Sequence, residues 1–157
     1  MSIDAFLRLG ETVTLGAHTF SAEEIKAFAR KYDPQPFHID EEAAEASVFG
    51  ALCASGWHTG AMWMRYNLQS LEREPPPAWS GEGPAPEFGP SPGLSAMKWP
   101  RPVYAGDTVT FTRKAVSHRP LASRPGWRLV KLEGGARNQD GAAVLTFDNA
   151  VLLKAAI

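Results

Sequence analysis

The sequence predicts an α+β domain in which helices pack on one face of an antiparallel sheet. Helical spacing of apolar residues dominates residues 22–71, whereas segments with strand-like composition dominate residues 102–153. Successive strands joined by turns favour antiparallel pairing, and helices that precede them in the chain cover one face of such a sheet. With 157 residues, 44% of them hydrophobic, the chain is long enough for one domain with its own core.

The first elements are two short strands and a helix. Residues 12–15 and 18–20 have strand-like composition. Ser21 and Glu24 then form a capping box, and the apolar residues behind them recur at helical spacing, which predicts a helix over 22–32. The helix is expected to end there because the following residue precedes a proline, which disfavours helical backbone.

The middle of the chain contains a stiff segment and a long helix. Two prolines within three residues predict that segment 33–40 is rigid and free of regular helix. Asp40 is expected to cap a short helix over 41–48. A longer helix is predicted over 56–71, and its apolar residues surround most of the circumference. It should therefore be central and largely buried.

The remainder combines an irregular loop with three strands. Residues 72–93 hold many prolines and glycines, which is typical of a long irregular loop. This loop is either a lid or wall beside the site, or a solvated insertion without a role. Strands over 108–112, 127–132 and 143–153 complete the sheet of a single predicted domain that spans 1–157.

The composition argues against several classes of protein. Lys and Arg number 16 and Asp and Glu 17, so a net charge of -1 disfavours nucleic acid as a partner. No apolar run is long enough to cross a membrane, and no signal peptide is visible. The single cysteine, Cys53, forms no intrachain disulfide, which favours a cytoplasmic protein. We expect Cys53 to be a small buried residue rather than a nucleophile.

Three segments together resemble a known family. Residues 33–40, Asp-Pro-Gln-Pro-Phe-His-Ile-Asp, are similar to the hydratase motif of the MaoC-like acyl dehydratases, a family that includes the (R)-specific enoyl-CoA hydratases. Residues 49–56 and 102–107 resemble the family's Phe-Gly to small-residue stretch and its Pro-Val-x-x-Gly-Asp segment. The resemblance implies a hotdog fold, in which the antiparallel sheet wraps around a central helix.

The chain departs from the family pattern at two positions. Gln35 stands where the family usually has Asn, and Ser55 precedes Gly56 where the family often has His. The five-residue spacing between Asp33 and His38 is intact, so the departures concern the shape and polarity of the pocket rather than this pair.

The resemblance implies roles for individual residues. Asp33 and His38 would be the catalytic pair that holds and activates a water molecule. The N–H of Gly56, at a helix N-terminus, would bind the thioester oxygen. Four further residues are candidates for substrate contact, because they lie near this helix start or within the motif: Ser55, Gln35, Trp57 and His58. For His58, a polar residue near a helix start is an equal alternative.

No cofactor or metal is predicted. His38, Asp40 and His58 show no recognised metal-ligand spacing. The predicted partner is an acyl-thioester small molecule, with CoA or acyl carrier protein as the handle. An open sheet edge and an exposed end of the central helix favour a homodimer or a dimer of dimers, with the pocket near the interface.

The predicted function is an acyl dehydratase or enoyl-thioester hydratase of fatty acid metabolism, which adds water to a trans-2-enoyl-CoA or removes it. Two alternatives remain open. The first is a hotdog thioesterase, against which the absence of Asp and Glu between Gly50 and Gln69 counts. The second is a non-catalytic protein that binds acyl thioesters, in which Gln35 and Ser55 mark lost activity.

Overall fold

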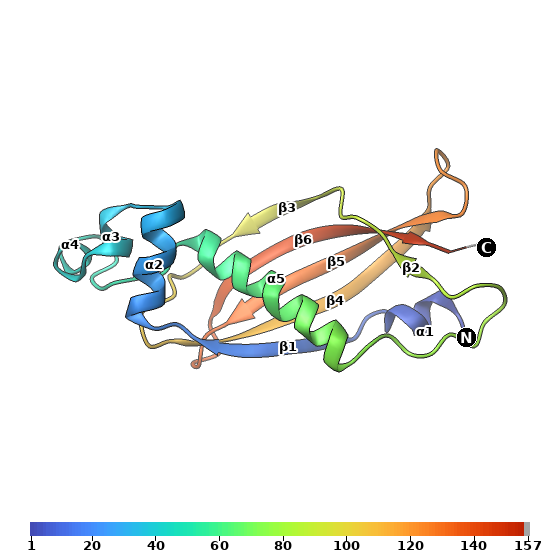
Figure 1. The fold of residues 1–157 in the computed structure, drawn as a ribbon, viewed down its shortest axis with the longest axis horizontal. Coiled ribbons are helices and arrows are strands. Elements are labelled where there is room, and N and C mark those ends of the chain that lie inside the picture. Colours follow the sequence, from blue (N-terminus) through green and yellow to red (C-terminus); the bar gives the residue numbers. More distant parts are fainter. Residues whose placement is uncertain (156–157) are drawn as a thin grey trace.

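The computed structural model describes residues 1–155, which form an antiparallel sheet curled around a long helix (Figure 1). The helices are α1 (Ile3–Leu7), α2 (Ala22–Tyr32), α3 (Pro36–Ile39), α4 (Glu41–Glu45) and α5 (Gly56–Arg73). The strands are β1 (Thr12–Thr19), β2 (Glu87–Phe88), β3 (Gly93–Lys98), β4 (Thr108–Pro120), β5 (Trp127–Arg137) and β6 (Ala143–Lys154). This arrangement confirms the predicted α+β hotdog class. The predicted domain also includes 156–157, which lie outside the described residues.

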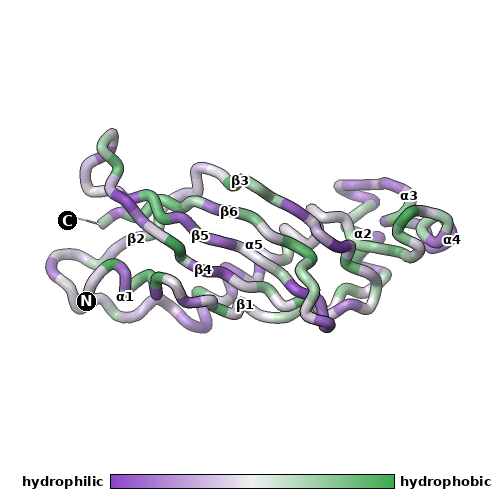
Figure 2. The backbone as a smooth tube through the Cα atoms, turned by 180° about the vertical axis from the view of Figure 1, so that it is seen from behind, coloured by the Kyte–Doolittle hydropathy of each residue, from purple (hydrophilic) through white to green (hydrophobic). Residues whose placement is uncertain are grey.

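The sheet has two distinct ends. Its order is β1-β4-β5-β6, and β2 and β3 both pair with β6, all antiparallel. Helices α2, α3 and α4 gather at one end, while α1 and β2 lie at the other (Figures 1 and 2). Helix α5 runs between these ends, so its first turn lies beside α2 and its last turn lies near α1.

Helix α2 confirms its prediction. It spans Ala22–Tyr32, and the Ser21 hydroxyl accepts a hydrogen bond from the Glu24 N–H at 3.2 Å. Ile25 and Ala29 are fully buried against the core. Asp33 is the C-cap of this helix, so its carboxylate lies at the end of the fold where α2, α3 and α4 gather.

The segment after α2 differs from its prediction. Residues Pro36–Ile39 form a short helix, because Pro36 occupies the first turn, where the missing N–H is not needed and the fixed φ suits helix. The expectation of no regular helix here is therefore wrong. Asp40 caps the next helix as predicted, accepting from the Ala43 N–H at 2.8 Å, although α4 ends at Glu45 rather than at residue 48.

Helix α5 is buried on one face only, which corrects the expectation of a largely buried helix. Its inner face holds Thr59 and Trp63, and the Trp63 indole donates to the Thr112 carbonyl at 2.9 Å. Trp57, Met64 and Leu68 are 61%, 45% and 54% exposed on the other side. The apolar residues do surround the helix, but no element among residues 1–155 covers this outer face.

The strands extend the predicted segments. The two short segments near the N-terminus form one strand, β1, with a bulge between Thr14 and Gly16. At Gly16 φ is +146° and the Tyr66 ring packs against the backbone. Strands β4, β5 and β6 are longer than predicted. The structure adds three elements that the sequence analysis does not predict: α1, β2 and β3. The predicted loop over 72–93 is accordingly shorter, because α5 continues to Arg73 and β2 pairs with β6.

The core consists of two groups of apolar side chains. The larger group lies between α5 and the sheet, and it includes Leu15, Phe20, Ile25, Trp63, Phe111, Val109 and Leu145. Each such side chain stabilises the fold by roughly 1.5–3 kcal/mol relative to exposure. The smaller group lies at the α1 end and includes Ile3, Phe6, Val130 and Leu153. No helix among residues 1–155 has the length and apolar character needed to cross a membrane.

Candidate active site

The end of α2, the start of α3 and the start of α5 bring three side chains together. Asp33 caps the C-terminus of α2, His38 lies in α3, and Ser55 precedes α5. The distance between Asp33 Oδ2 and His38 Nε2 is 3.4 Å, and the Ser55 hydroxyl donates to the same Asp33 oxygen at 2.7 Å. This hydrogen bond joins Ser55 to Asp33, which lie 22 positions apart in the chain.

The orientation of His38 is fixed by the backbone. Its Nδ1 lies 2.6 Å from the carbonyl oxygen of Cys53. Because a carbonyl only accepts, Nδ1 carries the hydrogen, and in the neutral ring Nε2 is an acceptor. The Cys53 region is itself held by bonds from Ala54 N–H to Val103 O (2.8 Å) and from Ala105 N–H to Leu52 O (3.1 Å). His38 therefore presents a free lone pair to Asp33.

The Asp33 carboxylate accepts on both oxygens. Gln35 Nε2 donates to Oδ1 at 2.8 Å, while Ser55 donates to Oδ2. Burial alone would raise the pKa of Asp33, but the hydrogen bonds from Ser55 and Gln35 act against it, and the pKa is lowered. Gln35 and Ser55 are both predicted to contact substrate. In the structure both side chains are hydrogen-bonded to Asp33, the candidate catalytic carboxylate.

Glycine is needed at position 56 because the Trp99 side chain occupies the space beside it. A Cβ at Gly56 would overlap the indole ring of Trp99, and Trp99 Nε1 donates to the Gly56 carbonyl at 2.9 Å. The Trp57 ring packs edge-on against Trp99 with centroids 5.3 Å apart. The space beside Gly56 is therefore filled by Trp99, 43 residues further along the chain, and no local spacing signals this contact.

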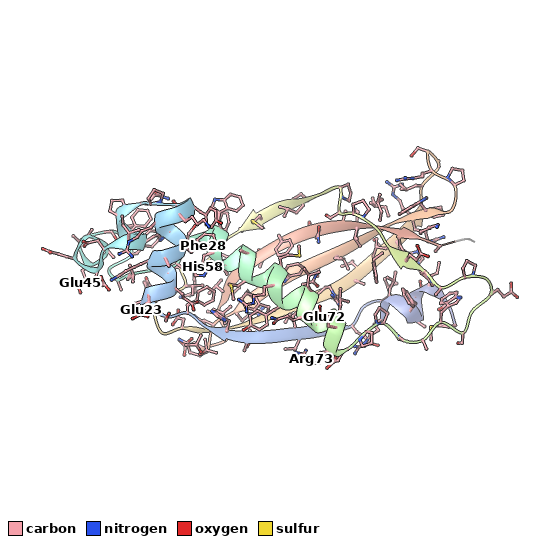
Figure 3. The ribbon with its side chains drawn as sticks, in the orientation of Figure 1. Glu23, Phe28, Glu45, His58, Glu72 and Arg73 are labelled. Carbon is pink, nitrogen blue, oxygen red and sulfur yellow. The ribbon has the colours of Figure 1, made fainter. Side chains whose placement is uncertain are left out.

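His58 lies deeper, where α2 meets α5. Its ring stacks on Phe28 at a centroid distance of 4.5 Å, and Figure 3 shows the two residues side by side. The side chain is 5% exposed, and its Nδ1 has no hydrogen-bond partner among residues 1–155. Burial lowers the pKa of His58 to about 4, although Glu24, 4.0 Å from Nε2, acts against this. His58 is therefore neutral near pH 7.

Cys53 is the small buried residue that the sequence predicts. It is 1% exposed, and burial raises the pKa of its thiol to about 11. A thiol with this pKa stays protonated near neutral pH and is a poor nucleophile. Its contribution to the site is the backbone carbonyl that holds His38.

Comparison with known proteins adds to this geometry. A family model described as "MaoC like domain" matches residues 7–125. A MaoC-like dehydratase from Rhodospirillum rubrum has a similar crystal structure, with 34% identity, a TM-score of 0.77 and coverage of 95% of this chain and 94% of that one. An uncharacterized Bacillus subtilis (strain 168) protein, YdeM, is 26% identical over 98% of this chain and 99% of its own length.

An (R)-hydratase of A. caviae involved in PHA biosynthesis also has a similar fold. It is 23% identical, with a TM-score of 0.66 and coverage of 94% of this chain and 96% of that one. At this level of identity the likeness concerns the fold, a curled sheet around a helix.

Proposed function

The chain belongs to the MaoC-like dehydratase family, and on this premise we propose that it adds water to a trans-2-enoyl thioester, or removes it in the reverse direction, through Asp33 and His38. The observation that carries the proposal is the pair of facing acceptors, Asp33 Oδ2 and His38 Nε2, 3.4 Å apart. In this proposal a water molecule in the active site donates one hydrogen bond to each of these two acceptors.

A water molecule held in this way is ready for addition. Its oxygen lone pair attacks the β-carbon of the enoyl group while Asp33 accepts one of its hydrogens, and His38 holds the other. The proton taken by Asp33 is then delivered to the α-carbon, so the elements of water are added across one double bond. Delivery from one side gives syn addition and, by family resemblance, an (R)-3-hydroxyacyl product. The reaction needs no redox or metal cofactor.

The negative charge that develops on the thioester oxygen requires a donor. We place the N–H of Gly56 in this role, because it opens the 18-residue helix α5 and the helix dipole adds positive potential there. Trp99 and the exposed Trp57 then form the wall beside the thioester. In this proposal Ser55 and Gln35 act by positioning Asp33.

We further propose that the working form is a homodimer or a dimer of dimers. The uncovered face of α5 presents Trp57, Met64 and Leu68, and β3 presents Leu94, which is 54% exposed. A second copy of the chain that covers this face would bury these side chains and enclose the thioester beside Gly56.

The deciding experiment is a hydration assay. Crotonyl-CoA and a longer trans-2-enoyl-CoA are incubated with the protein, and loss of the enoyl absorbance and release of free thiol are followed together. We expect absorbance loss without thiol, and a decrease of about 10²-fold or more in turnover for Asp33→Asn and His38→Gln with little loss of thermal stability. Asp40→Asn is the matched control, because Asn also caps α4 and position 40 lies outside the pair.

Other outcomes point elsewhere. Thiol release would identify a thioesterase. Tight binding of the enoyl thioester with no conversion would identify a binding protein, and full activity of either variant would refute the Asp33–His38 mechanism.

A further inference from the structure

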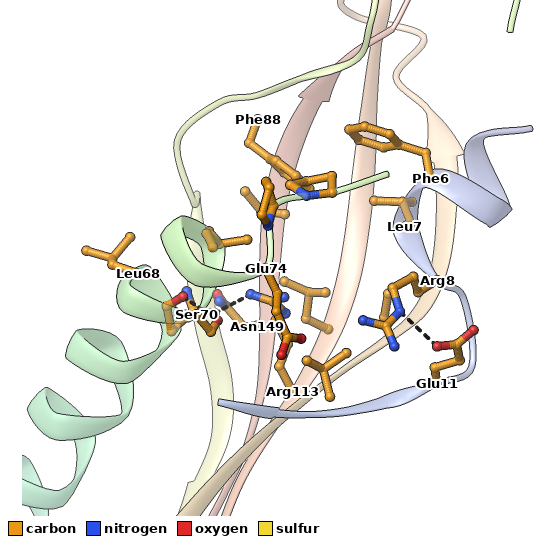
Figure 4. A pocket seen from close by; sticks show the side chains of 18 of the residues that line it. Phe6, Leu7, Arg8, Glu11, Leu68, Ser70, Glu74, Phe88, Arg113 and Asn149 are labelled. Atoms are coloured by element: carbon orange, nitrogen blue, oxygen red, sulfur yellow. Dashed lines mark hydrogen bonds and ion pairs between the residues drawn. The ribbon is translucent and has the colours of Figure 1, made fainter. Parts of the chain in front are cut away.

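A second cavity lies far from Asp33 and His38. It has a volume of about 280 Å³ and lies between the last turns of α5, the sheet, α1 and the segment after α5 (Figure 4). Ser55, which binds Asp33, precedes the first turn of α5, whereas the cavity is lined by residues of α5 from Met64 onward, about 12 Å or more further along the helix axis. Most of the wall is apolar, including Phe6, Leu7, Leu71, Phe88 and Val151.

One cation in this apolar wall has no carboxylate partner in the described part of the chain. Arg113 on β4 donates to Asn67 Oδ1 at 2.5 Å, and no Asp or Glu among residues 1–155 lies within ion-pair distance of its guanidinium. The carboxylates that line the cavity are already matched: Glu11 pairs with Arg8 at 2.8 Å, and Glu74 lies 3.8 Å from the neighbouring Arg73.

The surroundings of Arg113 disfavour the positive charge of its guanidinium. Burial, together with the nearby charge of Arg8, lowers the pKa of Arg113, which means that both disfavour the charged guanidinium. Arginine nevertheless stays protonated in proteins and offers five N–H donors in a planar fork. An anion placed beside it would satisfy the free donors and offset the cost of burial.

We propose that this cavity is a binding site for a medium-chain alkanoate, whose carboxylate meets Arg113 and whose hydrocarbon tail contacts the apolar wall. A carboxylate accepts two parallel hydrogen bonds from a guanidinium, and the bond to Asn67 Oδ1 restrains the orientation of the Arg113 guanidinium. The cavity volume of about 280 Å³ lies at the lower limit of typical ligand pockets, which favours a medium rather than a long chain.

The test is a calorimetric titration of the full-length protein with decanoate. We expect saturable binding to the wild type and a loss of about 10-fold or more in affinity for Arg113→Gln, because a charge-assisted bond is removed. Arg119→Gln is the matched control, since Arg119 lies on the same strand, is exposed and does not line the cavity. Decan-1-ol, which has the same tail without the charge, should bind more weakly and equally to the wild type and Arg113→Gln.

Several results would overturn the proposal. These are absence of decanoate binding to the wild type, equal affinity for Arg113→Gln, or competition between decanoate and crotonyl-CoA, which would place the ligand at the catalytic pair. If Arg113→Gln does not fold, Arg113→Lys tests the guanidinium alone, because it keeps the charge and loses the planar fork, and we expect weaker decanoate binding. An affinity for decanoate unchanged from the wild type would then refute the role of the guanidinium.

Discussion

At the scale of single residues, two side-chain hydrogen bonds converge on the carboxylate of Asp33. Ser55 and Gln35 each donate to a different oxygen of Asp33, and both bonds stabilise the ionised form. The two positions at which the sequence departs from the family motif therefore meet at the same side chain. Their shared effect is to keep a partly buried carboxylate ionised.

This arrangement predicts a shift in the pH dependence of activity. Ser55→Ala removes a bond that lowers the pKa of Asp33, so the pKa rises and the carboxylate becomes protonated at a higher pH. The acid limb of the kcat/KM profile should then move to higher pH, and hydration assays from acid to neutral pH would measure it. Ser70→Ala is the control, because the Ser70 hydroxyl donates to a helix carbonyl in α5. An unmoved limb would contradict the role of Ser55.

His58 predicts a pH dependence of stability. In the folded chain its pKa is about 4, against an ordinary value of 6.5, so below pH 6.5 the unfolded chain takes up a proton that the folded chain does not. Stability contributed by neutral His58 is complete above pH 6.5 and is lost progressively down to pH 4. Between about pH 7 and about pH 5 this amounts to about 2 kcal/mol.

Urea unfolding of the wild type and His58→Leu at both pH values provides the measurement. The variant should lose about 2 kcal/mol less than the wild type on acidification, because the leucine side chain carries no titrating group. Equal losses in the two proteins would show that His58 is not held neutral by its surroundings.

At the scale of elements, the first turns of α5 contain two glycines with opposite surroundings. A Cβ at Gly56 would overlap the Trp99 ring, whereas a Cβ at Gly60 would meet nothing within 4 Å. The first glycine is therefore required by packing, and the second is a weak point of the helix interior.

Alanine at each position should change stability in opposite directions. Gly56→Ala displaces Trp99 and is expected to destabilise the fold by about 1–3 kcal/mol. Gly60→Ala, the matched control, is expected to stabilise it by about 0.5–1 kcal/mol. Thermal unfolding followed by circular dichroism would measure both changes. A stabilised Gly56→Ala protein would show that Trp99 does not pack on this turn.

Local signals explain which elements the sequence predicts. Helix α2 carries its own cap at Ser21 and its own periodicity, so its predicted and observed bounds agree. Strand β3 has neither: it begins at Gly93, contains Ala96 with a φ of +52°, and owes its strand geometry to pairing with β6. A short motif likewise reveals Asp33 and His38 as candidates. The contact between Trp99 and Gly56 depends on tertiary packing, which local sequence does not encode.

At the scale of the whole molecule, three exposed apolar side chains lie on β3 and on the outer face of α5, where we propose that a second copy docks. Leu94 is on β3, and Met64 and Leu68 are on the outer face of α5. Sequence periodicity predicts that this face is buried, and the single chain leaves it uncovered. The predicted burial and the observed exposure of this face agree if another subunit covers it.

Light scattering after size-exclusion chromatography would test this assembly. We expect a mass of at least twice 17.1 kDa for the wild type, and a shift toward the single chain for Leu94→Glu, because a buried charge disfavours the interface. Val116→Glu, which replaces another exposed apolar residue on an inner strand of the sheet, should keep the wild-type mass. A single-chain mass for the wild type would refute the dimer.

The bond between His38 and the Cys53 carbonyl has a consequence for how this site tolerates sequence drift. Every amino acid brings the same carbonyl group, so the tautomer of His38 does not depend on which side chain occupies position 53. Replacements of Cys53 that fit the available volume leave the acceptor in place. The hydrogen bond that fixes the His38 tautomer therefore tolerates a change of side chain at position 53, whereas a shift of the main chain between Leu52 and Ala54 would break it.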